Sequence, residues 1–317
     1  MAVTADKLYA TILKGVGGLY TVRPDLVGED VPPRINCSAR GKLRSGEETP
    51  YPGDRVELEC SGGAWAIARI LERKNALRRP TVANVTHLAA VIPAARPKPD
   101  LMTADKLILY AESAGIEPIV VVNKSDLAPD YARHIAQVYE NAGYRSFLIS
   151  ALGGEGTDEL RDYVLSASSP SSPSTVTFSG ASGVGKSTLM TKLYPELSLA
   201  TGAVSRKSER GRHTTRTAEL FEVANGLFLA DTPGFTMLDF ARYNFFPSGD
   251  LAYLYREFEP YIGKCKYTKC THLREEGCAV IAAEKEGKIS PERRESYIKI
   301  YEEMKKTPDW ARKNQLR

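Results

Sequence analysis

The octapeptide Gly180–Ser187, Gly-Ala-Ser-Gly-Val-Gly-Lys-Ser, is the feature that most restricts the folds open to this 317-residue chain. It matches the phosphate-binding pattern G-x-x-x-x-G-K-[ST] and directly follows a predicted strand, Val176–Ser179. In such loops backbone N–H groups surround a phosphate chain, and the following helix directs its positive end there. We expect Lys186 to neutralise the β and γ oxygens and Ser187 to ligate Mg²⁺. The nucleotide-binding residues expected here are Gly180, Ala181, Ser182, Gly183, Val184, Gly185, Lys186, Ser187 and Thr188.

The sequence around this loop alternates short apolar runs with helical patterns. The runs are 86–92, 118–122, 147–150, 176–179 and 227–230, and the helical patterns cover 103–114, 131–142, 157–165 and 186–194. Buried strands separated by amphipathic helices predict a mostly parallel sheet covered on both faces. We therefore expect a central α/β domain over residues 74–240.

Two further motifs follow predicted strands and indicate which base is bound. In N-K-x-D sites, here Asn123, Lys124, Ser125 and Asp126, the carboxylate accepts two hydrogen bonds from guanine that adenine cannot supply. Lys124 would lie along the ring and Asn123 would brace the two loops. The next strand leads into Ser150, Ala151 and Leu152, a typical backbone contact to the guanine carbonyl oxygen. Because the carboxyl ends of parallel strands meet at one edge, the set predicts a GTP or GDP site and disfavours an ATPase.

A third motif, D-x-x-G, follows the run 227–230. Asp231 would hold the Mg²⁺ shell through water, and the Gly234 N–H would contact the γ-phosphate. Between this motif and the phosphate loop lies Gly-Arg-His-Thr-Thr-Arg, residues 211–216. One of its threonines should supply the second magnesium ligand of a switch segment. We favour Thr215, although the spacing does not separate it from Thr214.

The order of these motifs is unusual. In ordinary GTPases the phosphate loop, switch threonine and D-x-x-G precede N-K-x-D, whereas here the motifs at Asn123 and Ser150 come first. The same sheet forms if the original termini are joined and the chain is opened elsewhere. The Ser/Pro-rich stretch 166–174 lies where that joint is required. The sequence therefore predicts a circular permutation, with residues after 240 connected directly to the γ-phosphate switch.

The two ends of the chain differ from this central region. Residues 1–73 contain short period-two segments broken by Gly and Pro, which predicts a small β-barrel of the oligonucleotide-binding (OB) type or another small β domain. Residues 241–317 are helical, with Ser290-Pro291 as a helix start and an apolar stripe of Tyr297, Ile298, Tyr301 and Met304 that indicates core packing.

The C-terminal region also holds a cysteine–histidine cluster. The residues Cys265, Cys270, His272 and Cys278 offer three thiols and one imidazole, a set that suits tetrahedral Zn²⁺. Four protein ligands leave no open position, so we expect one structural site. The nearby bases Lys264, Lys266, Lys269 and Arg274 either face phosphates or form a solvated surface.

Taken together, these motifs resemble the circularly permuted, ribosome small-subunit-dependent GTPases (RsgA/YjeQ family). The resemblance covers nearly the whole chain, including the OB-like domain, the permuted order, residues 211–215 and the metal cluster. It implies a late assembly or checkpoint role on the small ribosomal subunit, with the terminal domains contacting rRNA. An alternative is an RNA-binding module whose affinity GTP switches, with incidental turnover.

Hydrolysis requires a group that positions water, and the residue after D-x-x-G, where many GTPases have Gln, is Phe235. Isolated turnover should therefore be slow and a partner should supply the missing positioning. His213 is the nearest candidate, with a plain exposed loop histidine as the alternative. We thus expect His213, Thr215 and Lys186 to be the catalytic residues.

Composition sets broader limits on function. The net charge is +4, which is mild for an RNA-binding protein, and 42% of the residues are hydrophobic. The apolar runs are far shorter than the roughly 18 residues of a spanning helix, and the N-terminus lacks a signal layout. These features predict a cytoplasmic protein without membrane contact, and we expect a monomer.

Overall fold

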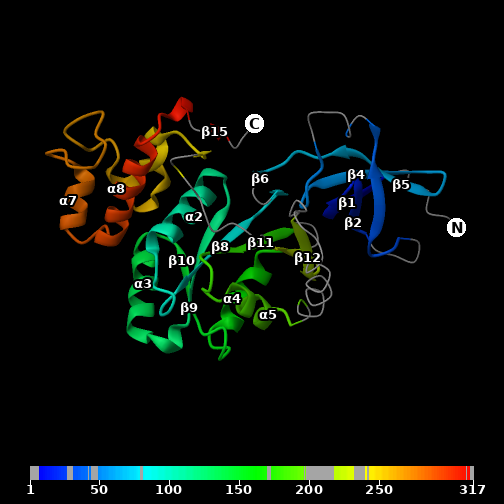
Figure 1. Ribbon diagram of the computed structural model, residues 1–317, viewed down its shortest axis with the longest axis horizontal. Coiled ribbons are helices and arrows are strands. Elements are labelled where there is room, and N and C mark those ends of the chain that lie inside the picture. The colour runs from blue at the N-terminus through cyan, green and yellow to red at the C-terminus, as the bar shows by residue number, and fades with distance from the viewer. Residues whose placement is uncertain are drawn as a thin grey trace. The chain divides into compact units, whose positions relative to one another are not determined.

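The computed structural model describes residues 7–26, 31–41, 43, 49–78, 81–169, 173–195, 197, 218–231, 240, 243–311 and 313–314 (Figure 1). The chain divides into two compact units. One comprises the described parts of 1–86, 164–177 and 196–234, and the other those of 87–163, 178–195 and 235–317. These units combine separate segments of the chain and do not correspond to the three consecutive domains expected from the sequence. The boundaries of those three domains remain predictions.

The N-terminal region is a closed five-stranded barrel, as predicted. Its strands are β1 (Leu8–Val16), β2 (Leu19–Pro24), β3 (Ile35–Ala39), β4 (Arg55–Ser61) and β5 (Ala64–Ile70), in the order β1-β2-β3-β5-β4. Side chains such as Ile12, Val56 and Ile67 fill its core. After the barrel strands in the sequence, β6 (Ala76–Arg78) and β7 (Thr81–Ala83) pair as a separate antiparallel hairpin.

A six-stranded sheet forms the central domain, in the order β10-β9-β8-β11-β13-β12. Its strands are β8 (His87–Pro93), β9 (Glu117–Asn123), β10 (Arg145–Ile149), β11 (Ser174–Ser179), β12 (Glu219–Ala224) and β13 (Leu227–Asp231). The pairs β8–β9, β9–β10 and β11–β13 are parallel, whereas β12–β13 is antiparallel. The mostly parallel sheet is thus confirmed, and β12 is a strand that the sequence analysis did not predict.

The helices of this domain lie close to their predicted positions. They are α2 (Leu101–Ser113), α3 (Pro129–Asn141), α4 (Thr157–Ser166) and α5 (Lys186–Leu193), with a 3-10 turn η1 (Ser125–Leu127). Asp100 caps α2 by accepting a hydrogen bond from the Thr103 amide at 3.2 Å. Among the helices of the described residues, none combines the length and the apolar character that crossing a bilayer requires.

The C-terminal region is helical with long irregular loops. Its elements are β14 (Tyr243–Asn244), η2 (Ser248–Leu254), η3 (Arg256–Tyr261), α7 (Ala279–Lys285), α8 (Pro291–Lys305), η4 (Asp309–Ala311) and β15 (Lys313–Asn314). The predicted start of α8 is present, because Ser290 Oγ accepts a hydrogen bond from the Arg293 amide. Of the predicted stripe, Tyr297 and Met304 are buried in the core and Tyr301 is half-buried.

A buried cluster of charges joins this region to α2. The Arg293 guanidinium donates to Asp105 and, at 2.7 Å, to Glu257, and all three side chains are at most 4% exposed. Tyr139 donates to Asp105 at 3.0 Å, and the Tyr255 ring lies 4.5 Å from the guanidinium carbon. Burial raises the pKa of Asp105, which Arg293 partly opposes. The cluster is arranged so that one cation serves two carboxylates.

The substitution Arg293→Met should lower stability strongly, because it leaves two carboxylates buried without a cation. Breaking such a pair typically costs about 3–5 kcal/mol. The control Arg133→Met removes an exposed ion pair with Asp130, which is worth about 1 kcal/mol or less. Thermal unfolding followed by circular dichroism should show a much lower midpoint for Arg293→Met. Equal midpoints for the two variants would contradict the structural importance of the cluster.

Candidate nucleotide site and metal centre

The phosphate-loop motif connects β11 to α5, as its sequence predicts. Gly180 has φ +156°, and a Cβ there would lie 2.4 Å from the Val91 carbonyl oxygen. Gly185 has φ +97°, and its Cβ would lie 2.4 Å from Asn123 Nδ2. A side chain at either position would collide with a neighbouring strand end. The glycines are therefore required by close packing as well as by the turn.

Lys186, the first residue of α5, points back into the loop. Its Nζ donates to the carbonyl oxygens of Gly180 and Ala181, both at 2.8 Å. Partial burial lowers the pKa of Lys186. Ser187 and Thr188, the next residues of the helix, are exposed. The ammonium group is thus held inside the curve of the loop, and the hydroxyl of Ser187 is accessible.

The N-K-x-D motif lies against this loop. The buried Asn123, at the end of β9, donates through Nδ2 to the Val184 carbonyl oxygen at 2.9 Å. The Lys124 ammonium donates to the carbonyl oxygens of Gly183 at 2.9 Å and Arg96 at 2.5 Å. Two motifs about sixty residues apart in the chain are therefore joined by direct hydrogen bonds.

The same asparagine also reaches the loop after β10. Its Oδ1 accepts a hydrogen bond from the Ala151 amide at 3.0 Å. Ser150 is buried and its hydroxyl accepts from the Gly153 amide at 3.2 Å, whereas Leu152 is 87% exposed. Asp126 lies in η1 with an exposed carboxylate, beside the half-buried Ser125. Three loops thus meet around Asn123 and leave the Asp126 carboxylate open to solvent.

Several predicted residues lie outside the described part of the chain. These are His213, Thr214, Thr215 and Gly234, together with Phe235 and residues 170–172 of the Ser/Pro-rich stretch. Asp231 ends β13, but its side chain is not described. The switch and D-x-x-G assignments therefore remain predictions.

The sequence analysis did not identify the segment that follows β8 as part of the nucleotide site. Pro97, Asp100 and Thr103 line a cavity of about 80 Å³ whose other wall includes Gly180 and Ser182 of the phosphate loop. No pattern marks this segment, although its place after a parallel strand predicts it at the same edge of the sheet. The N-terminal end of α2 is therefore a neighbour of the phosphate loop.

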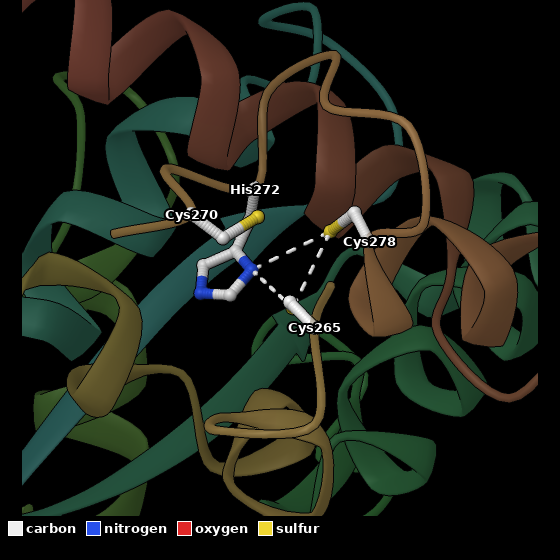
Figure 2. Close-up of side chains that lie close together, drawn as sticks. All are labelled: Cys265, Cys270, His272 and Cys278. Atoms are coloured by element: carbon white, nitrogen blue, oxygen red, sulfur yellow. Dashed lines mark hydrogen bonds between the residues drawn. The ribbon is translucent and has the colours of Figure 1, made fainter. Parts of the chain in front are cut away.

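The cysteine–histidine cluster forms in the loop region between η3 and α7 (Figure 2). The donor atoms of Cys265, Cys270, His272 and Cys278 all lie within 4.8 Å of one another. His272 Nδ1 is 3.6 Å from Cys265 Sγ and 3.5 Å from Cys278 Sγ, and these two sulfurs are 3.9 Å apart. The structure thus brings together all four residues that the sequence analysis selected.

The separations among Cys265, His272 and Cys278 fit three corners of a tetrahedral zinc site. With Zn–S of about 2.3 Å and Zn–N of about 2.05 Å, tetrahedral angles require about 3.8 Å between sulfurs and about 3.6 Å between sulfur and nitrogen. The three distances agree with these values to within about 0.1 Å. Burial lowers the pKa of His272, which keeps the imidazole in its neutral, ligating form. Burial raises the pKa of the Cys270 thiol to about 12, and a divalent cation reverses that shift because a coordinating thiol is deprotonated.

Glu275 holds the loop around the cluster and was not predicted from the sequence. Its carboxylate accepts from the amides of Thr271 at 2.7 Å, Leu273 at 2.8 Å and Arg274 at 3.0 Å, and from the Thr271 hydroxyl. Burial raises the pKa of Glu275, but these hydrogen bonds outweigh it and hold the pKa at about 2. The next residue, Glu276, is also acidic, so no sequence pattern distinguished Glu275. The Glu275 carboxylate therefore stabilises its own loop by accepting hydrogen bonds from the loop amides.

Comparisons with known proteins agree with this arrangement. The RsgA GTPase family model matches residues 70–241, and the RsgA N-terminal domain model matches residues 10–65. Similar proteins include the small ribosomal subunit biogenesis GTPase RsgA of Ruminiclostridium cellulolyticum, 38% identical and covering 95% of both chains. The protein of the same name from Clostridium botulinum is 40% identical, with 93% of this chain and 96% of its own covered.

Two solved structures are similar along nearly the whole chain. YjeQ from Thermotoga maritima superposes with a TM-score of 0.76 at 30% identity, covering 94% of this chain and 98% of its own. YloQ, described as a circularly permuted GTPase, gives a TM-score of 0.76 at 28% identity, covering 96% and 98%. With these likenesses and the phosphate and N-K-x-D loops joined at one sheet edge, the chain belongs to the RsgA family of circularly permuted GTPases, which hydrolyse GTP.

Proposed function

We propose that this chain binds the small ribosomal subunit and hydrolyses GTP to GDP and phosphate late in subunit assembly, with the subunit stimulating hydrolysis. The names of its relatives support the subunit as partner. In this proposal the barrel and the C-terminal region contact rRNA, and the protein acts as a cytoplasmic monomer. An RNA-binding module switched by GTP, with incidental turnover, is the competing function.

The contact of Asn123 and Lys124 with the phosphate loop is the main observation that supports guanine nucleotide binding in this proposal. Because their hydrogen bonds end on Val184 and Gly183, a base at Asp126 and phosphates at Lys186 would belong to one bound molecule. The family implies GTP, GDP and Mg²⁺. Gly180–Thr188 would bind the phosphates, and Ser187 with Thr215 would hold Mg²⁺, which neutralises charge on the phosphates when bound.

Slow intrinsic turnover follows from Phe235, which offers no hydrogen bond to an attacking water. In this proposal His213 orients that water once the partner orders the switch, while Lys186 and the loop amides stabilise charge on the leaving phosphate. The C-terminal region follows D-x-x-G directly in the chain. Contact of that region with the subunit would therefore be sensitive to the γ-phosphate.

Purified small subunits should accelerate GTP hydrolysis by this protein by about 10³–10⁵-fold, because a positioning group added by a partner is worth that much in related reactions. The measurement is phosphate release with small subunits, with large subunits and without either. Equal rates in the three conditions would contradict subunit-stimulated hydrolysis and favour the competing function, an RNA-binding module switched by GTP.

The variant His213→Ala should keep GTP affinity and lose the stimulation, and unchanged stimulation would remove His213 from the mechanism.

The substitution Asp126→Asn should weaken GTP binding about 5- to 150-fold, because the paired contact to guanine is worth about 1–3 kcal/mol. Titration with a fluorescent GTP analogue measures the loss. The control Asp130→Asn changes an exposed carboxylate four residues away, at the start of α3. Since xanthine presents an acceptor where guanine has its amino group, the variant should bind the xanthosine analogue better than GTP. Equal GTP affinity in both variants would contradict the role of Asp126.

We also propose one structural Zn²⁺ held by Cys265, Cys270, His272 and Cys278. Its binding energy would organise a loop-rich segment that has little secondary structure of its own.

Because the Glu275 carboxylate accepts hydrogen bonds from four donors of this segment, Glu275→Gln should accelerate zinc release to a chelator by about tenfold or more. Glu276→Gln is a matched control, since Glu276 is 88% exposed and 3.7 Å from Lys266. Equal release from both variants would show that Glu275 does not hold the loop.

A further inference from the structure

A second cavity lies beside the metal cluster, on the outside of the C-terminal region. It has a volume of about 430 Å³, within the roughly 300–1,000 Å³ of small-ligand sites. Its walls are η2, residues 262–272 and α8. Cys265, Cys270 and His272 belong to the inner wall. Their donor atoms lie within 4.8 Å of one another, so a metal ion would occupy a small part of this volume and leave the rest open.

Aromatic rings surround this cavity. Tyr297 forms its fixed back wall, because its side chain is buried and its hydroxyl donates to the Thr271 carbonyl oxygen at 2.8 Å. Tyr301 is half-buried, whereas Tyr253 and Tyr267 are 67% and 49% exposed. Exposed rings beside a cavity offer flat apolar faces at a small entropic cost, since a tyrosine has few rotatable bonds.

Positive charge accompanies the rings. Residues 262–274 carry four basic side chains and no acidic one. Lys269 lines the cavity itself, and Lys266 Nζ lies 5.4 Å from the centre of the Tyr267 ring. Of the two carboxylates that follow, Glu275 is occupied by the amides of its own loop, and Glu276 lies 3.7 Å from Lys266 Nζ. Lys269 is the one Lys or Arg among the lining residues, which include no carboxylate, so the position beside Lys269 favours an anion.

We propose that this cavity binds one unpaired RNA base, which stacks on the exposed tyrosines, with an adjacent phosphate at Lys269. The inference rests on the proposed function and deepens it, because the small subunit supplies the RNA. Stacking on aromatic rings combined with a basic edge is the common means of holding single-stranded nucleic acid. Bases inside a duplex are stacked on their neighbours and cannot enter.

A protein segment fits the cavity less well. Peptide docking grooves offer apolar pockets for aliphatic or aromatic anchors. The lining residues, all in the described part of the chain, include two aliphatic side chains larger than glycine, Ala252 and Ile262. The remainder are tyrosines, hydroxyl and thiol groups, glycines, His272 and Lys269. The composition therefore favours a planar, anionic ligand over an apolar one.

The substitution Tyr253→Ala in the full-length, zinc-loaded protein should weaken binding of a short, labelled, mixed-sequence single-stranded RNA about 5- to 150-fold. This range corresponds to the loss of one stacked base. Fluorescence anisotropy gives the affinity, and a duplex of the same sequence serves as the second probe. Tyr253→Phe should bind like the wild type, because it keeps the ring. Tyr131→Ala, which removes a 43% exposed tyrosine on α3, should also bind like the wild type.

The variant Lys269→Gln should weaken the same RNA and reduce the salt dependence of log affinity by about 0.7, because one phosphate contact is lost. Zinc content and thermal midpoint of each variant verify that the loop remains folded. Equal affinity of Tyr253→Ala and Tyr131→Ala for the single strand would overturn the inference, as would preferential binding of the duplex.

Loss of small-subunit affinity by Tyr253→Ala without loss of RNA affinity would also overturn it, since the cavity would then contact a ribosomal protein. Failure of the proposed function is a separate observation, namely that the wild-type protein hydrolyses GTP equally with and without small subunits.

Discussion

The two hydrogen bonds of the Asn123 amide are the contacts on which the nucleotide site depends. One ends on Val184 in the phosphate loop and the other begins at Ala151 after β10, so a single buried group fixes three loops. An unpaired buried polar atom costs about 1–3 kcal/mol, which means that each loop is held where it satisfies this amide. These contacts do not depend on the order in which the three loops occur in the sequence. Strand pairing brings the loops to one edge of the sheet, and the permuted connections leave that edge unchanged.

This dependence explains which parts of the structure could be predicted from the sequence. The motifs and their strands are local signals, and β9 and β11 lie within two residues of the predicted ranges. The edge strand β12 was missed because it is mostly half-buried and lacks a continuous apolar run. The cluster of Asp105, Glu257 and Arg293 joins residues up to 188 positions apart, and charged residues in a sequence are ordinarily read as surface groups. Pairing over such separations leaves no local pattern.

The same cluster defines how the C-terminal region is attached to the nucleotide-binding unit. Arg293 on α8 pairs with Asp105 in the middle of α2, and Lys106, the next residue of α2, pairs with Glu303 at 2.6 Å. The N-terminal end of α2 lines the cavity against the phosphate loop. One helix therefore lines a cavity with the phosphate loop at its first turn and pairs with α8 along its next turn. The side chains of α2 that lie between the phosphate loop and the C-terminal region belong to no nucleotide motif.

The position of the aromatic cavity against the metal cluster has a physical reason. Residues 262–278 form little regular secondary structure, so their order must come from specific contacts that offset the entropy of fixing the backbone. The four side chains of the cysteine–histidine cluster and the Glu275 carboxylate supply such contacts from inside the loop. A loop ordered in advance loses less entropy when it binds a ligand. Tyr267 and Lys269, which lie between two of the cluster cysteines in the sequence, are thereby presented on a rigid support, and a flexible single strand bears most of the ordering cost of binding.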